Sequence, residues 1–343
     1  MRQSKKLSLS SKSIPLSRAP LSPFVRRFIK RVLNTVKKFD LWEKGDSFVV
    51  CVSGGPDSLC LLDVLSLLAE KYHFAIHIAH VNYHLRGEDS DLDEKLVVTY
   101  AQKYSLPSTI LSHKKNSKNL SEEKLRDVRY AFFEKLRTKK SADSIIVAHN
   151  QDDQAETLLM RLLRGSGLSG LSAMRPKNNT VIRPLIEMSR TDILHYLKDR
   201  NISFREDKSN TDPRYLRNKI RHELIPFLET HFQPQTKKLF AETALLLGED
   251  YATLQNIQRT LCVKYEPHAL EFSRKAFLLL PQALAHKELR TLLLPFLDGK
   301  NPEKNIINEL IKAIKSTKSK SQKITFKGLK FIRKGDRVRL LNF

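Results

Sequence analysis

The sequence has only three cysteines in 343 residues and no C-x-x-C pair. So few cysteines indicate a fold without a disulfide framework and a reducing compartment, which predicts a cytoplasmic protein. The absence of a C-x-x-C pair argues against a metal or iron–sulfur cluster held by thiolates. No apolar run is long enough to cross a bilayer, so we expect no membrane partner.

Two common nucleotide-binding motifs are also missing. There is no G-x-x-x-x-G-K-[ST], the loop that holds the β- and γ-phosphates for γ-phosphoryl transfer. There is no G-x-G-x-x-G either, which argues against a dinucleotide-binding fold. Acidic residues are scarce, since 37 Asp and Glu stand against 61 Lys and Arg, for a net charge of +24. That excess favours a polyanionic partner, although a generally basic proteome is an alternative.

The sequence does contain a glycine turn, Ser53-Gly54-Gly55-Pro56-Asp57-Ser58, between an apolar run and a helical one. Glycines let the backbone approach an anion closely, and the start of a helix adds N–H groups and the positive end of its dipole. All six residues are therefore predicted to bind a phosphate-bearing cofactor. Asp57 beside phosphates implies an intervening Mg²⁺, with Asp57 as its ligand. The alternative is an ordinary turn between a strand and a helix.

Strand-like and helical segments alternate from residue 24 to residue 200. The strand-like runs are apolar on both faces, as in a parallel sheet covered by helices. We expect strands at 48–52, 75–81, 108–112 and 144–148, and helices at 24–36, 57–71, 88–104, 121–137, 152–164 and 190–200. The predicted fold class is α/β, a doubly wound, mainly parallel sheet with its ligand site beyond the carboxyl ends of the strands.

The sequence predicts a tail and two domains. Residues 1–22 are rich in Ser, Lys and Arg, contain no acidic residue, and are expected to form a disordered basic tail. Residues 23–230 are expected to form the nucleotide-binding catalytic domain. Residues 235–343 are expected to form a basic, mainly helical domain that binds the polyanionic partner. Its predicted helices are Ala241–Val263, Arg274–Asp298 and Glu303–Ser316, and two short strands are expected around Lys334-Gly335-Asp336.

Two carboxylates, Asp153 and Glu156, lie three residues apart just after the fourth strand-like run. On the first turn of a helix this spacing puts both on one face, where they could clamp Mg²⁺ or an ammonium group. Helix capping by Asp152 or Asp153 is the alternative. Beside a phosphate loop we favour the functional interpretation.

Several arginines are candidates for contact with phosphate or RNA. Arg126 and Arg129 lie in a predicted helix, where covering the helix surface is an equal alternative. Arg161 precedes a glycine-rich loop that either closes over a polyphosphate or caps the helix. Arg217 follows an acid-rich turn at 206–212, and these residues alone favour a capped helix with a solvated basic face.

Taken in order, these motifs resemble those of the tRNA(Ile)-lysidine synthetases, within the PP-loop ATP pyrophosphatase superfamily. The string S-G-G-P-D-S marks only the superfamily. The later strings are more specific: H-V-N-Y-H-L-R-G, A-H-N-Q-D-D-Q-A-E-T, R-L-L-R-G-S-G-L-S-G-L, R-P-L and S-N-T-D-P-R-Y-L-R-N-K-I-R. The resemblance covers residues 24–230, and the C-terminal region matches only in length and basic character.

The resemblance implies a C–N-bond-forming ligase that uses ATP and Mg²⁺. ATP would adenylate O2 of the wobble cytidine in a tRNA(Ile) with a CAU anticodon, releasing pyrophosphate. The amine of free L-lysine would then attack C2 and displace AMP, leaving lysidine and switching decoding from AUG to AUA. The resemblance assigns the loop Ser53–Ser58 to the phosphates, Asp57 to Mg²⁺, Asp153 and Glu156 to lysine, and Arg126 and Arg217 to the adenylate or the anticodon backbone.

Three rival functions are less well supported. A tRNA thiolase needs reactive or cluster-holding cysteines, and Cys51, Cys60 and Cys262 are not spaced for either. A small-molecule amidating synthetase is disfavoured by the charge excess, and a non-catalytic RNA-binding module by the intact set of Asp57, Asp153 and Glu156. The sequence leaves the oligomeric state open, with a homodimer among the options.

Overall fold

The structure is a computed structural model that describes residues 20–85, 87–113, 121–205, 214–256, 261–266, 269–297, 302–317, 322–326 and 329–342. Most of the expected basic tail and the whole acid-rich turn at 206–212 lie outside these residues. The chain divides into two compact units, one ending at Ala252 and the other covering Thr253–Phe343.

The N-terminal unit is built on a six-stranded sheet with the order β3-β2-β1-β4-β6-β5. All neighbouring strands are parallel except β5 and β6, which form an antiparallel pair at one edge. The expected mainly parallel, doubly wound sheet is therefore confirmed. The strands are β1 (Ser47–Cys51), β2 (Ala75–Asn82), β3 (Ser108–Ser112), β4 (Ser144–Ile146), β5 (Lys177–Asn178) and β6 (Val181–Ile182).

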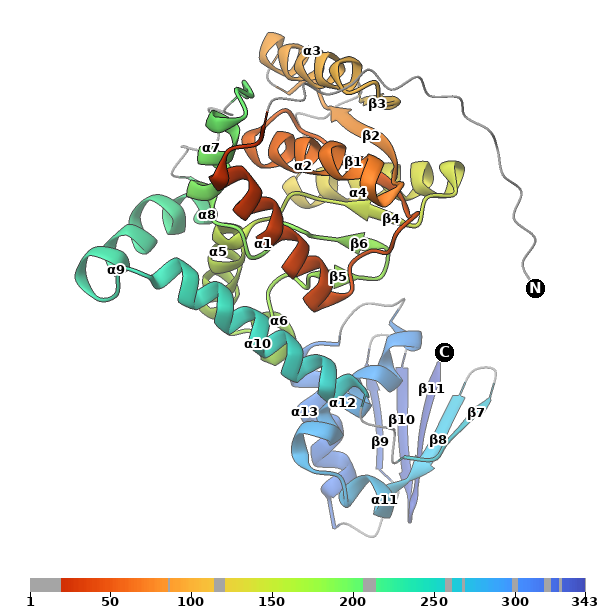
Figure 1. Cartoon of the computed structure of the whole chain (residues 1–343). Helices are drawn as coiled ribbons and strands as arrows, with labels where there is room; N and C mark the ends of the chain where they lie inside the picture. Colours follow the sequence, from red (N-terminus) through yellow and green to blue (C-terminus); the bar gives the residue numbers. More distant parts are fainter. Residues whose placement is uncertain are drawn as a thin grey trace. The chain divides into compact units, whose positions relative to one another are not determined.

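Helices cover both faces of this sheet (Figure 1). Adjacent residues of β1 point to opposite faces, so Val50 packs in one hydrophobic cluster and Val49 in another, and neither is exposed. The first cluster includes α1 (Pro23–Phe39), α2 (Pro56–Tyr72), α3 (Glu88–Lys103) and α7 (Arg190–Asp199), and the second is covered by α4 (Glu122–Lys140). Burial on both faces explains why these strands are apolar throughout.

The remaining helices of this unit follow β4 or the edge strands. They are α5 (Gln151–Leu163), α6 (Leu168–Leu171), α8 (Leu216–Lys219), a π-helical turn at Ile220–Leu224, α9 (Ile225–His231) and α10 (Thr236–Asn256). Ala244 of α10 packs with Leu158 of α5 and with Ala173. The division between the units consequently falls inside α10, later than the break expected at 230–235.

The C-terminal unit contains a five-stranded antiparallel sheet with the order β7-β8-β11-β10-β9. The two strands expected around Gly335 are present as β10 (Leu329–Lys334) and β11 (Arg337–Asn342). The strands β7 (Val263–Glu266), β8 (Ala269–Ser273) and β9 (Gln322–Phe326) were not expected. They carry charged or polar residues on one face and therefore lack the apolar run of a buried strand. The helices are α11 (Arg274–Leu278), α12 (Gln282–Leu293) and α13 (Lys304–Lys315), with a 3₁₀ turn at Leu294–Phe296.

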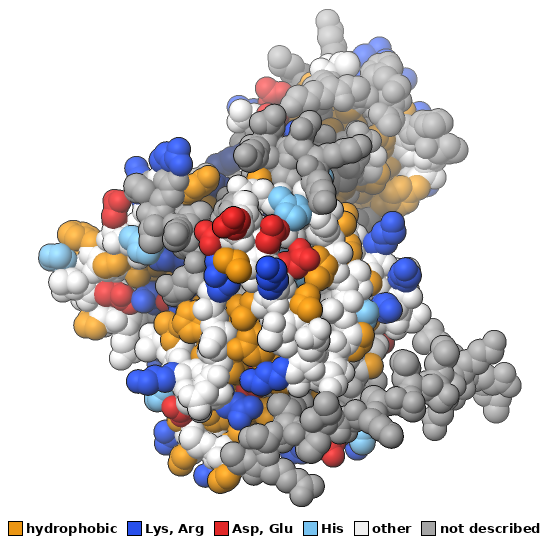
Figure 2. Space-filling view, turned by 90° about the horizontal axis from the view of Figure 1, so that it is seen from above, with side chains coloured by type: hydrophobic (Ala, Val, Ile, Leu, Met, Phe, Trp, Pro, Cys, Tyr) orange, Lys and Arg blue, Asp and Glu red, His pale blue; other side chains and the backbone are white. Residues whose placement is uncertain are grey.

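The face seen in Figure 2 carries both basic and acidic side chains. Lys and Arg lie at many separate places, several Asp and Glu side chains lie together beside a histidine, and other acidic side chains lie singly. None of the helices described by the structure combines the length and hydropathy needed to span a membrane.

Candidate active site

The glycine turn adopts a defined loop between β1 and α2. Gly54 has a φ of +90°, a left-handed backbone conformation that other residues adopt only with strain. Gly55 is the N-cap of α2 and Pro56 occupies the first helical position, where a missing N–H costs nothing. The Ser58 hydroxyl donates to the Gly55 carbonyl at 2.9 Å and accepts from the Ser53 N–H at 3.2 Å. These hydrogen bonds within the loop fix its shape.

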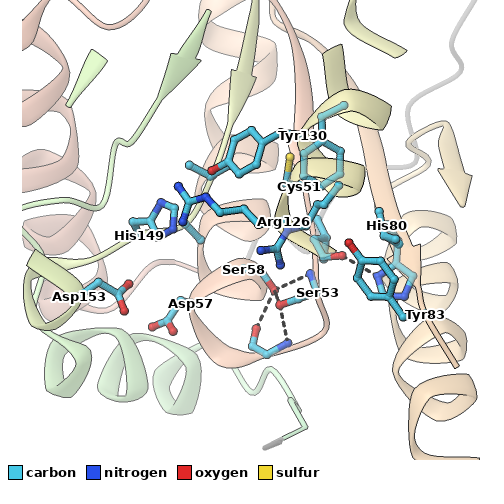
Figure 3. A pocket seen from close by; sticks show the side chains of 17 residues that line it. Cys51, Ser53, Asp57, Ser58, His80, Tyr83, Arg126, Tyr130, His149 and Asp153 are labelled. Carbon is cyan, nitrogen blue, oxygen red and sulfur yellow. Dashed lines mark hydrogen bonds between the residues drawn. The ribbon is translucent and has the colours of Figure 1, made fainter. Parts of the chain in front are cut away.

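This loop opens into a cavity of about 260 Å³ at the carboxyl ends of the strands (Figure 3). The central strands β1 and β4 are neighbours, and the chain continues from them toward opposite edges of the sheet. Such a switch point is where open α/β sheets bind ligands. Residues at or after the carboxyl ends of β1, β2 and β4 line the cavity, together with side chains of α2, α4 and α5. Four of the residues expected to bind phosphate are among them: Ser53, Gly55, Asp57 and Ser58.

Asp57 lies in the first turn of α2 and is mostly buried. One carboxylate oxygen accepts from Nδ2 of Asn150 at 3.0 Å, and the other accepts from Nη1 of Arg190 at 2.9 Å. Burial raises the pKa of Asp57 to about 6, which Arg190 partly opposes and the neighbouring Asp153 reinforces. The site therefore holds a carboxylate whose negative charge is incompletely compensated.

Asp153 belongs to the start of α5, where it takes part in helix capping and also lines the cavity. Asn150 is the N-cap, and its side-chain oxygen accepts from the Asp153 N–H while the Asp153 carboxylate accepts from the Asn150 N–H. This reciprocal pair is a capping box. Figure 3 shows the Asp153 and Asp57 side chains on the same side of the cavity. The capping and functional interpretations of Asp153 are therefore compatible.

Glu156 is buried and is not among the residues that line the cavity. Its side chain is 1% exposed and is held by two arginines from the segment after 213. Arg217 Nε donates to Glu156 at 2.6 Å while its Nη2 donates to Asp153 at 2.6 Å. Arg221 Nε donates to the second Glu156 oxygen at 2.5 Å. The two carboxylates do share a face, as their spacing predicts, and Arg217 bridges them.

Helix α4 contributes a positive wall to the cavity. Arg126, Arg129 and Tyr130 all line it, and the Arg126 guanidinium lies 5.2 Å from the centre of the Tyr130 ring. Arg161 has a different role, because it donates to the carbonyls of Gly170 and Ala173 at 2.7 Å and so supports the glycine-rich loop.

Sequence reasoning missed four polar residues around this site. His149 and His80 line the cavity, Arg190 contacts Asp57, and Arg221 contacts Glu156. His149 had a signal, because it immediately follows the fourth strand and precedes the N-cap of α5. Arg221 had a weak signal, because it stands in the string R-N-K-I-R with Arg217, whereas Arg190 had none, because it reaches Asp57 from a distant segment of the chain.

The cavity offers few oxygen ligands for a magnesium ion. Asp57 and Asp153 line it, and the part of the chain that the structure describes has no cluster of three or more His, Cys, Asp or Glu side chains suited to a metal. Mg²⁺ in nucleotide sites needs only one or two carboxylates, since phosphate oxygens and water supply the rest. The incompletely compensated Asp57 carboxylate fits that minimal role.

Comparison with known proteins gives one family and a consistent set of relatives. The PP-loop domain family matches residues 24–228. The tRNA(Ile)-lysidine synthase of Clostridium tetani is 45% identical over 207 residues, which are 59% of this chain and 44% of that protein. The synthase of Geobacter sulfurreducens is 43% identical over 67% of this chain and 50% of its own length. The synthase of Clostridium acetobutylicum is 35% identical over 85% of this chain and 65% of its own length. The chain spans about half the length of most of these curated relatives.

Among solved structures, the U34-tRNA thiolase NcsA from Methanococcus maripaludis, solved with its [4Fe-4S] cluster, has a similar fold. The TM-score is 0.53 at 18% sequence identity, over 70% of this chain and 81% of the thiolase. At that identity the likeness concerns the fold alone.

Proposed function

Since the chain belongs to the PP-loop domain family, which implies the use of ATP, we propose that it is a tRNA(Ile)-lysidine synthetase. It joins L-lysine to C2 of the wobble cytidine of a CAU-anticodon tRNA(Ile), through an adenylated cytidine, and releases pyrophosphate and AMP. The observation that carries the proposal is that the glycine turn, with its Asp57, lines one cavity together with Asp153 and the arginines of α4. The names of the relatives support the choice of substrate.

In the adenylation step, the loop and α4 handle the negative charge. The backbone N–H groups at the start of α2, with the Ser53 and Ser58 hydroxyls, bind the phosphates of ATP. Arg126 and Arg129 stabilise the charge that develops as O2 of cytidine attacks the α-phosphorus and pyrophosphate leaves. Mg²⁺, when bound, would be held by Asp57 and would neutralise part of the pyrophosphate charge.

In the ligation step, Asp153 is better placed than Glu156 to meet lysine. Asp153 lines the cavity, whereas Glu156 is enclosed by Arg217 and Arg221. We assign Asp153 to bind the lysine ammonium group. Glu156 is assigned to hold Arg217 in place beside Asp153. Arg217 then acts near the adenylate through this ion-pair cluster. An amine oriented by a carboxylate can lose its proton and attack C2 with AMP as the leaving group.

The cysteines favour ligation over thiolation. Cys51 lines the cavity, but burial raises the pKa of its thiol well above its usual value, with Arg129 opposing only in part. A buried, protonated thiol is a poor nucleophile. Cys60 is buried in α2, and Cys262 belongs to the other unit, so neither joins Cys51 in this cavity.

The C-terminal unit is proposed to contact the tRNA backbone. Along β10 and β11 alternate residues are buried, and the intervening ones put Lys330, Arg337 and Arg339 on the opposite face of the sheet. Positive side chains on an exposed sheet suit the phosphates of RNA and make binding dependent on salt.

The proposal is tested with purified protein, ATP and a CAU-anticodon tRNA(Ile). We expect tRNA-dependent ATP–pyrophosphate exchange, and then lysine-dependent release of AMP with labelled lysine incorporated into the tRNA. Asp57→Ala is expected to abolish adenylation, whereas Asp153→Ala should weaken the use of lysine more. Formation of ADP, or an unaltered nucleoside after digestion of the tRNA, would overturn the proposal. AMP release without lysine uptake would point to a thiolase or another amine donor.

A further inference from the structure

His149 is a cavity residue with no assigned role in the reaction just described. It lies between β4 and Asn150, the N-cap of α5, at the switch point of the sheet. In Figure 3 its ring lies on the same side of the cavity as Asp153 and Asp57. A histidine at this place can act as a base, as an acid or as a fixed hydrogen-bond donor, and the choice depends on its two ring nitrogens.

Arg183, the arginine of the R-P-L motif, decides between these roles. It follows β6 and is 5% exposed, and its Nε donates to Nδ1 of His149 at 3.2 Å. Its Nη1 donates to the Arg175 carbonyl at 2.8 Å, which fixes the guanidinium plane. A guanidinium can only donate, so Nδ1 of His149 must be the acceptor. The ring proton of neutral His149 is thereby assigned to Nε2.

The surroundings of His149 also oppose a second proton on the ring. Burial lowers the pKa of His149 well below its usual value, and Arg183, Arg217, Arg126 and Arg129 lower it further. The carboxylates in the same cavity, Asp57 and Asp153, do not reverse this effect. The ring therefore stays neutral at the pH values at which a free histidine gains its charge.

We propose that Arg183 is a positioning residue that fixes His149 as a neutral Nε2–H donor, and that this donor binds a phosphoryl or carbonyl oxygen of the reactants in the cavity. The inference rests on the proposed function for the identity of those reactants. Both oxygens accept the hydrogen bond that such a donor offers. The phosphoryl oxygens carry negative charge as pyrophosphate leaves, and O2 of the cytidine gains negative charge when the lysine amine displaces it as an oxygen of AMP. His149 in this form has no basic nitrogen to offer, so the proton of the attacking amine goes to another group.

Two substitutions of His149 test the donor. His149→Gln keeps an N–H donor at a similar distance, whereas His149→Leu removes it at similar size. We expect His149→Gln to stay within about 10-fold of the wild-type adenylation rate and His149→Leu to lose about 10²–10³-fold. Equal rates for the two variants would overturn the proposal.

A nucleotide-binding measurement without RNA distinguishes the two oxygens. If the donor binds a phosphoryl oxygen of ATP, His149→Leu weakens binding of a non-hydrolysable ATP analogue. If it binds the carbonyl oxygen of the base, affinity for the analogue is unchanged and only the tRNA-dependent rate falls. Either result supports the donor, provided that His149→Gln rescues the affected quantity.

The tautomer is tested independently of any activity. In full-length protein labelled with ¹⁵N-histidine, we expect the His149 ring to give the Nε2–H signature throughout about pH 5.5–8.5. His149→Gln identifies its signals by their loss. A His149 ring that titrates near its ordinary pKa, or that carries its proton on Nδ1, would overturn the role of Arg183. Because this readout needs no RNA or lysine, it stands even if the proposed reaction proves wrong.

Substitution of Arg183 completes the test. Arg183→Met should let the neutral ring carry its proton on either nitrogen and should lower the adenylation rate, whereas Arg183→Lys, which retains a cationic donor, should restore the wild-type signature in part. Arg27→Gln, an exposed site on α1, removes the same charge away from the cavity and should leave the His149 signals unchanged. If Arg183→Met fails to fold, the wild-type spectrum and the two His149 variants still decide the question.

Discussion

The two compact units place their charged groups differently. In the N-terminal unit, charged side chains are buried and held by several partners at once, as Glu156 is by Arg217 and Arg221. In the C-terminal unit, Arg339 pairs with Glu266 across an exposed part of the sheet, where their side chains are 40% and 54% exposed. Its interior is mainly an apolar cluster that includes Phe331 and Leu340, although Glu288 and Arg333 are also buried there.

We infer that the buried groups serve the proposed chemistry and that the exposed groups serve solubility and contact with the proposed RNA partner. A buried charge is costly unless it is paired, and removing one partner leaves the other uncompensated. An exposed pair is screened by water and contributes little. Substitutions should therefore have large and distinct effects in the N-terminal unit and, on the sheet surface of the C-terminal unit, small ones.

The largest effect is expected at Asp57. Asp57→Asn should reduce adenylation by more than about 10³-fold, because the charge that would hold Mg²⁺ is lost. Burial raises the pKa of Asp57 to about 6 from 3.8, so its ionisation opposes folding as the pH rises through this range. The same variant should therefore gain about 1–3 kcal/mol in the free energy of unfolding at neutral pH and nothing below pH 3.8.

Urea denaturation at neutral pH and below pH 3.8 measures the change in the free energy of unfolding, and ATP–pyrophosphate exchange measures adenylation. Glu70→Gln, at an exposed position of the same helix, is the matched control and should change neither quantity. A variant that is inactive and also less stable at neutral pH would contradict the view that Asp57 is retained at a cost to folding.

The next effect concerns the apolar interior of the C-terminal unit. Phe331→Ala should lower the free energy of unfolding of that unit by about 3–5 kcal/mol, since the side chain is fully buried. Binding of an ATP analogue should not change, because the cavity belongs to the other unit. Loss of nucleotide binding in a folded Phe331→Ala protein would show that the two units are energetically coupled.

Glu156→Gln probes the buried ion pairs of the N-terminal unit. It keeps the shape but removes the charge that two arginines share, and we expect a loss of about 2–4 kcal/mol in the free energy of unfolding. Lysine-dependent AMP release should fall as well, because Arg217 loses its fixed position beside Asp153. Thermal denaturation tests the loss of stability, and single-turnover assays test the fall in AMP release. If neither quantity changes, Glu156 has no role in the proposed site.

The pH dependence of adenylation gives a finer test. Activity should fall as the pH drops through about 6, because Asp57 then gains a proton. Arg190 lowers the pKa of Asp57, so Arg190→Gln should move this fall to higher pH, by up to about one unit. Rates measured across the pH range in a constant-ionic-strength buffer show the direction, and a shift to lower pH would contradict the assignment.

The smallest effect is expected at the exposed pair of the C-terminal unit. Glu266→Gln should change the free energy of unfolding by less than about 0.5 kcal/mol. By adding net positive charge it should tighten tRNA binding slightly at low salt. A cost comparable to that of Glu156→Gln would erase the distinction between the two units.

The sequence was most informative where burial imposes a simple pattern. The strands β1, β2 and β4 are largely buried, so their apolar runs and the turn after β1 predicted both the sheet and the place of the cavity. The strands β7 to β9 alternate polar and apolar residues over a few positions, and no run distinguished them from helix or loop.

Within the site, local spacing predicted local geometry but not partners. The three-residue interval of Asp153 and Glu156 correctly put their carboxylates on one face. It could not show that Arg217 and Arg221, more than 60 residues away, would enclose Glu156 and leave only Asp153 at the cavity. Contacts of that kind depend on the register of distant segments, which no short motif records.

The side chain of Asn150 accepts one hydrogen bond and donates another, and the two bonds serve different purposes. Its amide oxygen accepts from the first turn of α5, and its amide nitrogen donates to Asp57. An aspartate would cap the helix equally well, yet it would set a second negative charge against Asp57 and lose the donor. The replacement of a single NH₂ group by oxygen, the mildest change that a side chain can undergo, would therefore leave the helix intact and disable the site.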